Sequence, residues 1–248
     1  MSSNIVSNPK SGLSKISIFT LSIIFIGSMI TTTVNAQAAL LVLIFGDKIA
    51  TEKFHTSIEA GLNFSGMNGL DPSKMRHGLY FGLGTYLKIN DKWAFTPEFK
   101  PLSQRGVRQT EPIVAYAGME EPVYGILMNY IDVPLLVQYK LTRMLFVSAG
   151  PQISFLTSAK QDANGTVAFS GKEIEVIENR KEDFNPLYIS IPLEIGFSLP
   201  EVIPGQGIDL KIRYNIGLNE VIKNEAYGSS TLNTWQVMLS FPFIKKTN

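Results

Sequence analysis

The sequence of 248 residues predicts an all-β fold, an antiparallel up-and-down barrel of eight strands. Eight segments after residue 54 alternate apolar and polar side chains with a period of two, as strands do. The connections between them alternate long and short, as in a barrel whose two chain ends lie at one side. Glycine and serine crowd the face opposite the apolar one, which suits the cramped interior of an eight-stranded barrel.

The residues before the first strand predict export from the cytoplasm. Two lysines precede an apolar run from Ile16 to Ile30, and small and polar residues follow it. This is the layout of a secretory signal, and the run is shorter than the roughly 20 residues that span a bilayer as a helix. We therefore expect residues 1–36 to be a signal peptide, with cleavage after Ala36 or Ala38.

Residues 37–54 form a short N-terminal apolar segment ahead of the predicted barrel, which takes up residues 55–248. Gly46 and Asp47 interrupt the apolar part of this segment, so it is too short to cross a membrane. The pattern is consistent with a short helix docked on the barrel and, equally, with a first strand or a loosely ordered leader.

Eight predicted strands share the two-residue period. In chain order they are 55–66, 77–89, 92–102, 129–141, 144–156, 187–199, 208–218 and 233–243. On the face opposite the apolar one, the first strand carries Gly61, the second carries Gly82 and the third carries Glu98. No helical stripe of comparable length competes with this alternation, which makes the domain all-β.

The later segments carry the same pattern with different inner residues. The fifth sets Ser148 and Gly150 against its apolar face, and the sixth alternates with hardly an exception around Glu194. The seventh places Arg213 among polar residues, and the eighth carries Trp235 on its apolar face. Each segment therefore has one face for the barrel interior and one for the exterior.

Pro134 lies in the middle of the fourth segment, NYIDVPLLVQYKL. A proline has no N–H for a sheet ladder and normally marks an edge or a bulge. Here the apolar period continues unbroken from Ile131 to Leu141, and a one-residue bulge would reverse it. We expect a continuous strand that lacks one hydrogen bond, with Pro134, Pro192 and Pro242 all facing the barrel interior.

The lengths of the connections predict the orientation of the barrel. Connections one, three, five and seven are long, and connections two, four and six are short or intermediate turns. In an outer-membrane barrel with both chain ends in the periplasm, the odd-numbered connections are extracellular and tolerate length. Strands of roughly 11 to 14 residues tilted by about 40° also match an apolar band about 25 Å tall.

The composition of the two faces indicates that the apolar face points outward, toward lipid. A soluble barrel would expose a face dense in lysine and glutamate, whereas this polar face is rich in small residues. Aromatic side chains near the segment ends are typical of membrane interfaces. The predicted interfacial aromatics are Trp93, Phe99, Tyr139, Tyr214, Trp235 and Phe243. The less favoured alternative is a soluble lipocalin-like lipid carrier with the apolar face inward.

Charged residues on the inner face predict a salt-bridged network in the lumen. They are Glu59, Glu98, Lys100, Asp132, Glu194, Lys211 and Arg213. Charges in a closed interior are tolerated only when they are paired and hydrogen-bonded. A structural network that fixes the cross-section of the barrel is the favoured interpretation, and a proton or ion path is the alternative.

Four stretches resemble strands of the PorT-like outer-membrane β-barrel family of Gram-negative bacteria. They are YIDVPLLVQYKL, SAGPQISFL, ISIPLEIGFSL and IRYNIGLNEV, and the resemblance covers most of residues 55–243. It implies an eight-stranded barrel that the barrel-assembly machinery delivers from the periplasm. One member of that family is linked to protein secretion, and the loops of this chain give no reason to carry that role over.

The remaining chemistry predicts no enzyme, no cofactor and no metal site. His55 and His77 each lie at the start of a segment without a carboxylate cluster, and the chain has no cysteine. The net charge of +1, evenly spread, argues against a nucleic-acid partner.

We therefore expect a bacterial outer-membrane protein, in contact with outer-membrane lipid, with a structural or interaction role carried by its extracellular loops. The mixed-charge loop 159–185 is a candidate surface for an extracellular partner, although a solvated loop is the simpler interpretation. A periplasmic protein partner is the other option. The alternative function is a narrow pore or transporter for small solutes or ions.

Overall fold

The computed structural model describes residues 51, 53–70, 72–167, 169–203, 206–224 and 230–243. The expected signal peptide, and all but the last few residues of the N-terminal apolar segment, lie outside the described residues. None of the helices in these ranges has the length and apolarity to cross a bilayer.

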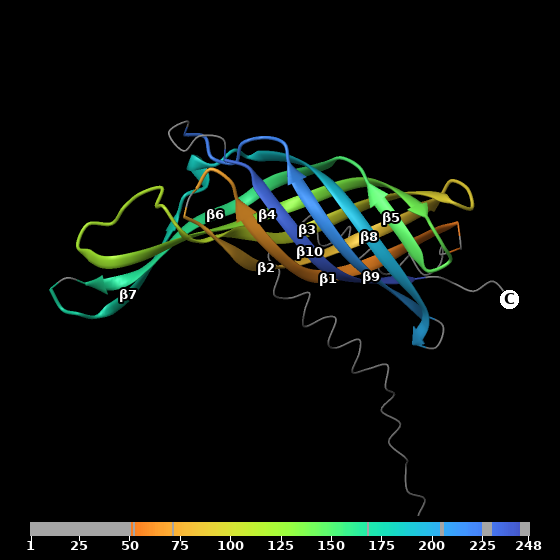
Figure 1. Ribbon diagram of the computed structural model, residues 1–248, viewed down its shortest axis with the longest axis horizontal. Coiled ribbons are helices and arrows are strands. Elements are labelled where there is room, and N and C mark those ends of the chain that lie inside the picture. Colours follow the sequence, from red (N-terminus) through yellow and green to blue (C-terminus); the bar gives the residue numbers. More distant parts are fainter. Residues whose placement is uncertain are drawn as a thin grey trace, which may run out of the picture. The chain divides into compact units, whose positions relative to one another are not determined.

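The described residues form one antiparallel sheet that closes on itself (Figure 1). Its strands are β1 Phe54–Met67, β2 Lys74–Lys88, β3 Trp93–Thr110, β4 Met119–Lys140, β5 Leu145–Ala149, β6 Gln152–Val167, β7 Glu173–Asn179, β8 Leu187–Ile203, β9 Gln206–Gly217 and β10 Leu232–Phe243, with a short 3-10 turn at Lys181–Asp183. Most strands pair with their neighbours along the chain, β5 and β6 both pair with β4 and β8, and β10 pairs with β1 to close the ring. The predicted all-β barrel is confirmed.

The ring contains eight strands because β5 and β6 together form one of them. Ala149 pairs with Val137 of β4 and Gln152 pairs with Pro134, so the register continues across the two residues between β5 and β6. The same continuity holds on the other side, toward β8. Among the described residues, β7 pairs with β6 alone, and it lies outside the ring, as the extension in Figure 1 shows.

Pro134 sits in an uninterrupted part of β4, as predicted. Val133, Pro134 and Leu135 alternate outward, inward and outward. The pairing with β6 reaches Pro134 without a shift there, and the pairing with β5 resumes at Val137 in the same register. The carbonyl of Pro151 accepts a hydrogen bond of 2.9 Å from the N–H of Leu135, directly beside it. Pro192 and Pro242 are also buried in the interior. The missing ladder bond is therefore local.

A bulge that the sequence did not reveal occurs in β3, next to Pro101. Lys100 pairs with Asp132 and Ser103 pairs with Tyr130, so three steps along β3 match two along β4. The extra residue reverses the alternation, which is the usual effect of a bulge. Lys100 faces the interior before the bulge, and Ser103 and Arg105 face it afterward.

Connections three and five are shorter than predicted, because their strands continue past the barrel wall. The sequence placed a loop over residues 104–125, but β3 continues to Thr110 and β4 begins at Met119. The loop predicted over 159–185 is largely the β6–β7 hairpin. Outside a membrane neither face of a strand needs to be apolar, so the two-residue period fades there.

The two ends of the barrel differ, as Figure 1 shows. The turns β2–β3, β4–β5 and β8–β9 lie at one end, here called the short-turn end. The β3–β4 and β6–β7 hairpins project from the other, here called the long-hairpin end. This arrangement follows the predicted parity of the connections.

The apolar face of the wall points outward, which contradicts the soluble-carrier alternative. Leu62, Phe81 and Leu239 each expose more than 40% of their surface. The interior holds polar and charged side chains, with small residues opposite the large ones. A Cβ added at Gly82 would lie 2.6 Å from the Cγ of Lys100, and one at Gly196 would overlap the ring of Phe146. Glycine therefore makes room for bulky inner neighbours.

Replacement of Gly196 by valine should destabilise the barrel by about 1–3 kcal/mol, because the new side chain collides with Phe146 in a packed interior. The measurement is urea unfolding in lipid vesicles, followed by heat-dependent gel mobility. Phe146→Ala should cost less stability in the Gly196→Val chain than in the original chain, and Ile195→Val on the lipid face serves as the control. Full stability of Gly196→Val would contradict the described packing.

Candidate functional site

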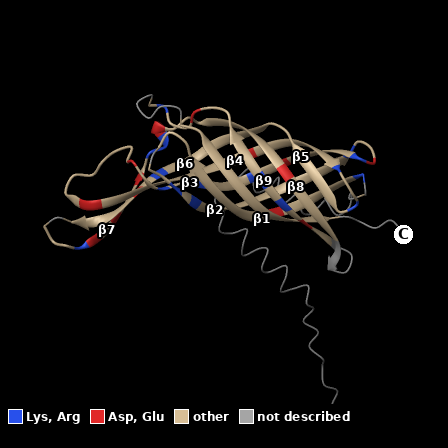
Figure 2. Ribbon diagram, viewed as in Figure 1, with Lys and Arg blue, Asp and Glu red and all other residues tan. Residues whose placement is uncertain are grey.

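The barrel interior contains a cluster of six acidic and basic side chains, here called the lumen cluster. Its members are Glu59, Glu98, Lys100, Glu194, Lys211 and Arg213, each no more than 7% exposed. They come from β1, β3, β8 and β9, and Figure 2 marks such acidic and basic positions along the barrel strands. Three carboxylates balance three cations, so the cluster is formally neutral.

Arg213 is the centre of the lumen cluster. Its Nη1 and Nη2 donate to the two carboxylate oxygens of Glu98 at 2.8 and 2.6 Å, a bidentate arrangement. Its Nε donates to Oε2 of Glu194 at 2.8 Å. Because β9 and β3 are four places apart in a ring of eight, the pair with Glu98 joins opposite walls of the barrel.

The two lysines complete the lumen cluster. The Nζ of Lys100 lies 3.0 Å from Oε2 of Glu98, and the Nζ of Lys211 lies 2.6 Å from Oε1 of Glu59. Lys211 also lies 3.8 Å from Glu98. Six of the seven charged residues named from the sequence therefore meet in one place.

Asp132, the seventh of them, pairs with a residue that the sequence did not identify. Its Oδ2 accepts a hydrogen bond from Nη2 of Arg105, and both side chains are fully enclosed. The Arg105 guanidinium also lies over the ring of Tyr130, 5.1 Å from its centroid. Arg105 faces inward only because of the bulge at Pro101, and no sequence pattern announced that bulge.

Apolar side chains close the lumen at the long-hairpin end. Leu70, Phe184, Val221 and Ile222 come from the connections, are at most 1% exposed, and pack against inward-facing Met67, Val107, Ile126, Met128, Tyr130, Leu156, Ala159, Tyr188 and Leu232. A bridge between Phe184 and Ile222 ties two of these connections together. The Tyr188 hydroxyl donates to the carbonyl of Leu232. We call this group the apolar cap.

Beyond the apolar cap, β4, β6 and β7 form a three-stranded sheet, here called the outer sheet. Val123, Asn164 and Glu175 are partners across it, as are Glu120, Thr166 and Glu173. Members of each row share a face, because paired residues in a sheet point the same way.

The β3–β4 connection supports the outer sheet from one side. The Gln161 side chain accepts a hydrogen bond of 2.7 Å from the Ile113 N–H and donates one of 2.7 Å to the Val114 carbonyl. The Tyr116 hydroxyl donates to Glu178 at 2.6 Å. Burial and this carboxylate raise the pKa of Tyr116, and the hydrogen bond lowers the pKa of Glu178. The sheet is therefore held in one arrangement.

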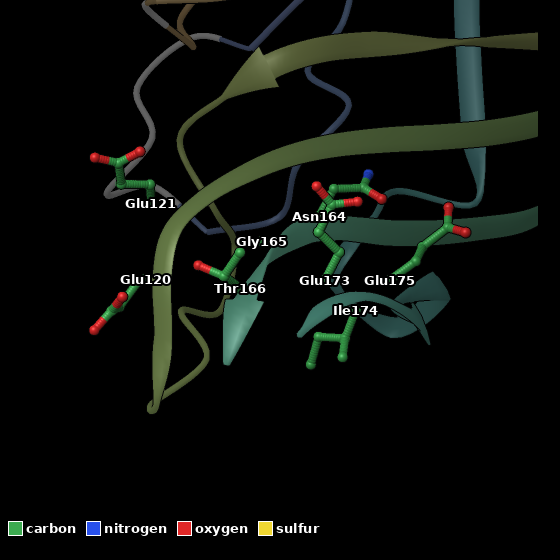
Figure 3. Close-up of a pocket in the computed structure, with 8 residues that line it drawn as sticks. All are labelled: Glu120, Glu121, Asn164, Gly165, Thr166, Glu173, Ile174 and Glu175. Carbon is green, nitrogen blue, oxygen red and sulfur yellow. The ribbon is translucent and has the colours of Figure 1, made fainter. Parts of the chain in front are cut away.

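A hollow of about 540 Å³ lies at the tips of β4, β6 and β7 (Figure 3). Its lining residues are Glu120, Glu121, Asn164, Gly165, Thr166, Glu173, Ile174 and Glu175. The four glutamates are exposed, and the described part of the chain gives them no ion-pair partner. Four acidic side chains line this hollow, and it lies partly within the loop 159–185 singled out from the sequence.

Five of the six predicted interfacial aromatics lie toward one or the other end of the barrel, and Phe99 does not. Trp93 packs on Tyr139 at the short-turn end and Tyr214 on Trp235 toward the long-hairpin end, each with ring centroids 4.6 Å apart. Phe243 ends β10 and pairs with Thr56 near the start of β1.

Phe99 lies between Glu98 and Lys100, at the level of the lumen cluster, and not at an interface as expected. It seemed close to a strand end because β3 was expected to stop at Leu102, whereas the strand continues to Thr110. Because β3 is longer than expected, Phe99 lies well inside the strand and not near its end.

The two histidines lie apart in the structure. His55 stacks on Tyr86 at 4.6 Å, near the short-turn end, and His77 packs edge-on against Phe64. Within the described ranges no group of three or more metal-ligating side chains comes together.

Arg105→Met should destabilise the barrel by about 3–5 kcal/mol, because it leaves the Asp132 carboxylate buried and unpaired. Adding Asp132→Asn removes the stranded charge and should restore much of that loss. Unfolding midpoints in lipid vesicles provide the measurement, with Arg143→Met at an exposed turn as the matched control. Identical midpoints for Arg105→Met and Arg143→Met would show that the buried pair contributes nothing.

Comparisons with solved structures give matches with low sequence identity. Neisserial surface protein A matches with 12% identity and a TM-score of 0.41, covering 77% of this chain and 96% of that one. The attachment invasion locus protein Ail of Yersinia pestis matches with 14% identity and a TM-score of 0.38, covering 78% and 100%. The outer membrane protein OprG from Pseudomonas aeruginosa has 12% identity and a TM-score of 0.38, covering 79% and 98%.

No curated protein matches the sequence. Residues 35–223 match the family model described as outer membrane protein beta-barrel domain, which covers most of the chain. The match does not distinguish branches of the family, so the PorT-like resemblance and the signal peptide stay predictions. The chain belongs to the outer membrane protein beta-barrel domain family, and it is a β-barrel of the bacterial outer membrane.

Proposed function

We propose that this protein is a closed, non-enzymatic barrel that anchors a protein-binding surface at the outside of the bacterial cell. The observation that carries the proposal is the double closure of the lumen. The lumen cluster joins opposite walls through Arg213 and Glu98, and the apolar cap fills the space above it. An eight-stranded barrel has room only for side chains, and these two layers of side chains support a lumen that is closed to solutes.

The interaction surface in this proposal is the outer sheet. It lies at the long-hairpin end, the end that faces the cell exterior in outer-membrane barrels with both chain ends in the periplasm. Hydrogen bonds from Gln161 and Tyr116 hold it in place, so little ordering would be needed on binding. Surface elements on a rigid scaffold are common sites of recognition.

One observation favours the alternative, a narrow pore for small solutes or ions. Polar atoms inside the barrel, such as the hydroxyls of Tyr80 and Ser148, have no partner among the described residues. Buried polar groups of this kind commonly hold water. A chain of such waters around the lumen cluster would be the route for a small ion.

Planar-bilayer recordings separate the two functions. The purified full-length barrel should produce no steady single-channel current, because the lumen cluster and the apolar cap close its lumen. A conducting porin reconstituted in the same way is the control for insertion. Steady currents that disappear in Glu98→Gln or Arg213→Met would contradict the proposal and establish the pore.

A further inference from the structure

We propose that the free edge of β7 binds an extended basic segment of another protein, which adds to the outer sheet as a further strand. This inference rests on the proposed function, because it names the partner class of the same surface. Strand addition to a sheet edge is a general mode of peptide recognition, in which main-chain hydrogen bonds give affinity and side chains give specificity.

The first argument is the regularity of β7. It pairs with β6 at a constant register from Lys160 opposite Asn179 to Thr166 opposite Glu173, without a bulge. Its sequence, EIEVIEN, contains no proline. Proline, bulges, covering elements and charge are the usual protections of an exposed edge. β7 contains neither proline nor bulge, and among the described residues no second strand pairs with it. Its glutamates supply the charge.

The second argument is the direction of the backbone groups. Val167 N–H donates to the carbonyl of Lys172 at one end of the β6–β7 pair, and Arg180 N–H donates to the carbonyl of Ala159 at the other. In an antiparallel pair, every second residue exchanges such bonds with the neighbouring strand. Even-numbered residues of β7 therefore bond to β6. The N–H and C=O groups of Glu173, Glu175 and Ile177 point to the free edge.

The third argument is the chemistry of the side chains along that edge. Glu173 and Glu175 share a face with Glu120, beside the acidic hollow, and have no ion-pair partner in the described ranges. On the opposite face Ile174 is 38% exposed. Opposite charges across a strand pair stabilise it, and apolar side chains pair with each other. The matching strand alternates lysine or arginine with apolar residues.

The same charges disfavour a second copy of this chain as the occupant. Two β7 strands paired edge to edge would place glutamates of one copy near glutamates of the other. Like charges facing each other across strands are destabilising. The acidic edge therefore prevents self-association and still accepts a basic strand.

The test uses the full-length barrel in lipid nanodiscs and three peptides of eight residues. The first alternates lysine with valine, the second alternates glutamate with valine, and the third is the lysine peptide with N-methyl groups on alternate residues. The methyl groups keep the charge but prevent strand pairing. We expect the lysine peptide to bind at least about tenfold more tightly than either of the others.

Two barrel variants separate strand addition from simple charge attraction. Ile177→Pro removes one N–H from the free edge but keeps all charges and the bonds to β6, and it should abolish binding of the lysine peptide. Ile177→Val is its matched control and should bind normally. Glu173→Gln with Glu175→Gln should weaken binding about tenfold or more, since two cross-strand charge pairs are lost.

Undiminished binding to Ile177→Pro, or equal binding of the N-methylated peptide, would overturn strand addition. Equal binding of the glutamate peptide would overturn the selection for a basic partner. Unchanged heat-dependent gel mobility shows that each variant is folded. A barrel that carries no current yet ignores the lysine peptide contradicts only this inference, whereas a conducting barrel contradicts the proposed function.

Discussion

The pairing of Arg213 with Glu98 is the interaction on which the rest of the barrel depends. It connects β9 to β3 across the lumen, and Glu194 and the two lysines take up the remaining charge. An unpaired charge in so enclosed a space would be very costly, so the strands must bring all six groups together. The register of the sheet places these six groups at one level, and small inner residues such as Gly82 leave room for their side chains.

Much of the barrel could be predicted from the sequence because lipid imposes a strict rule on one face. Where the wall crosses the membrane, the alternation of apolar and polar side chains predicted each strand, including the one that contains Pro134. Where strands leave the lipid, as in β7, both faces can be polar and the signal disappears. The bulge at Pro101 could not be predicted either, because a proline in a strand gives no sign of whether a bulge accompanies it. Since the bulge was not predicted, Arg105 was not predicted to face the lumen and pair with Asp132.

In the proposed function, the lumen and the outer sheet have different chemistries. Inside, side chains of balanced formal charge and the apolar cap occupy the lumen, beside polar atoms such as the Tyr80 hydroxyl that lack a hydrogen-bond partner among the described residues. Outside, β6 and β7 continue past the barrel wall and end in an acidic edge, where Glu173 and Glu175 have no ion-pair partner among the described residues. The barrel presents this edge in a fixed position, which favours recognition by main-chain pairing.

The account rests on the claim that Glu98 and Arg213 act together across the lumen. A double-mutant cycle with Glu98→Gln and Arg213→Met, measured by equilibrium unfolding in lipid vesicles, tests it most directly. The account predicts a coupling of about 2–3 kcal/mol, with the double variant losing much less stability than the two single losses summed. Additive losses would contradict it, because they would mean that the opposite walls are not joined by this pair.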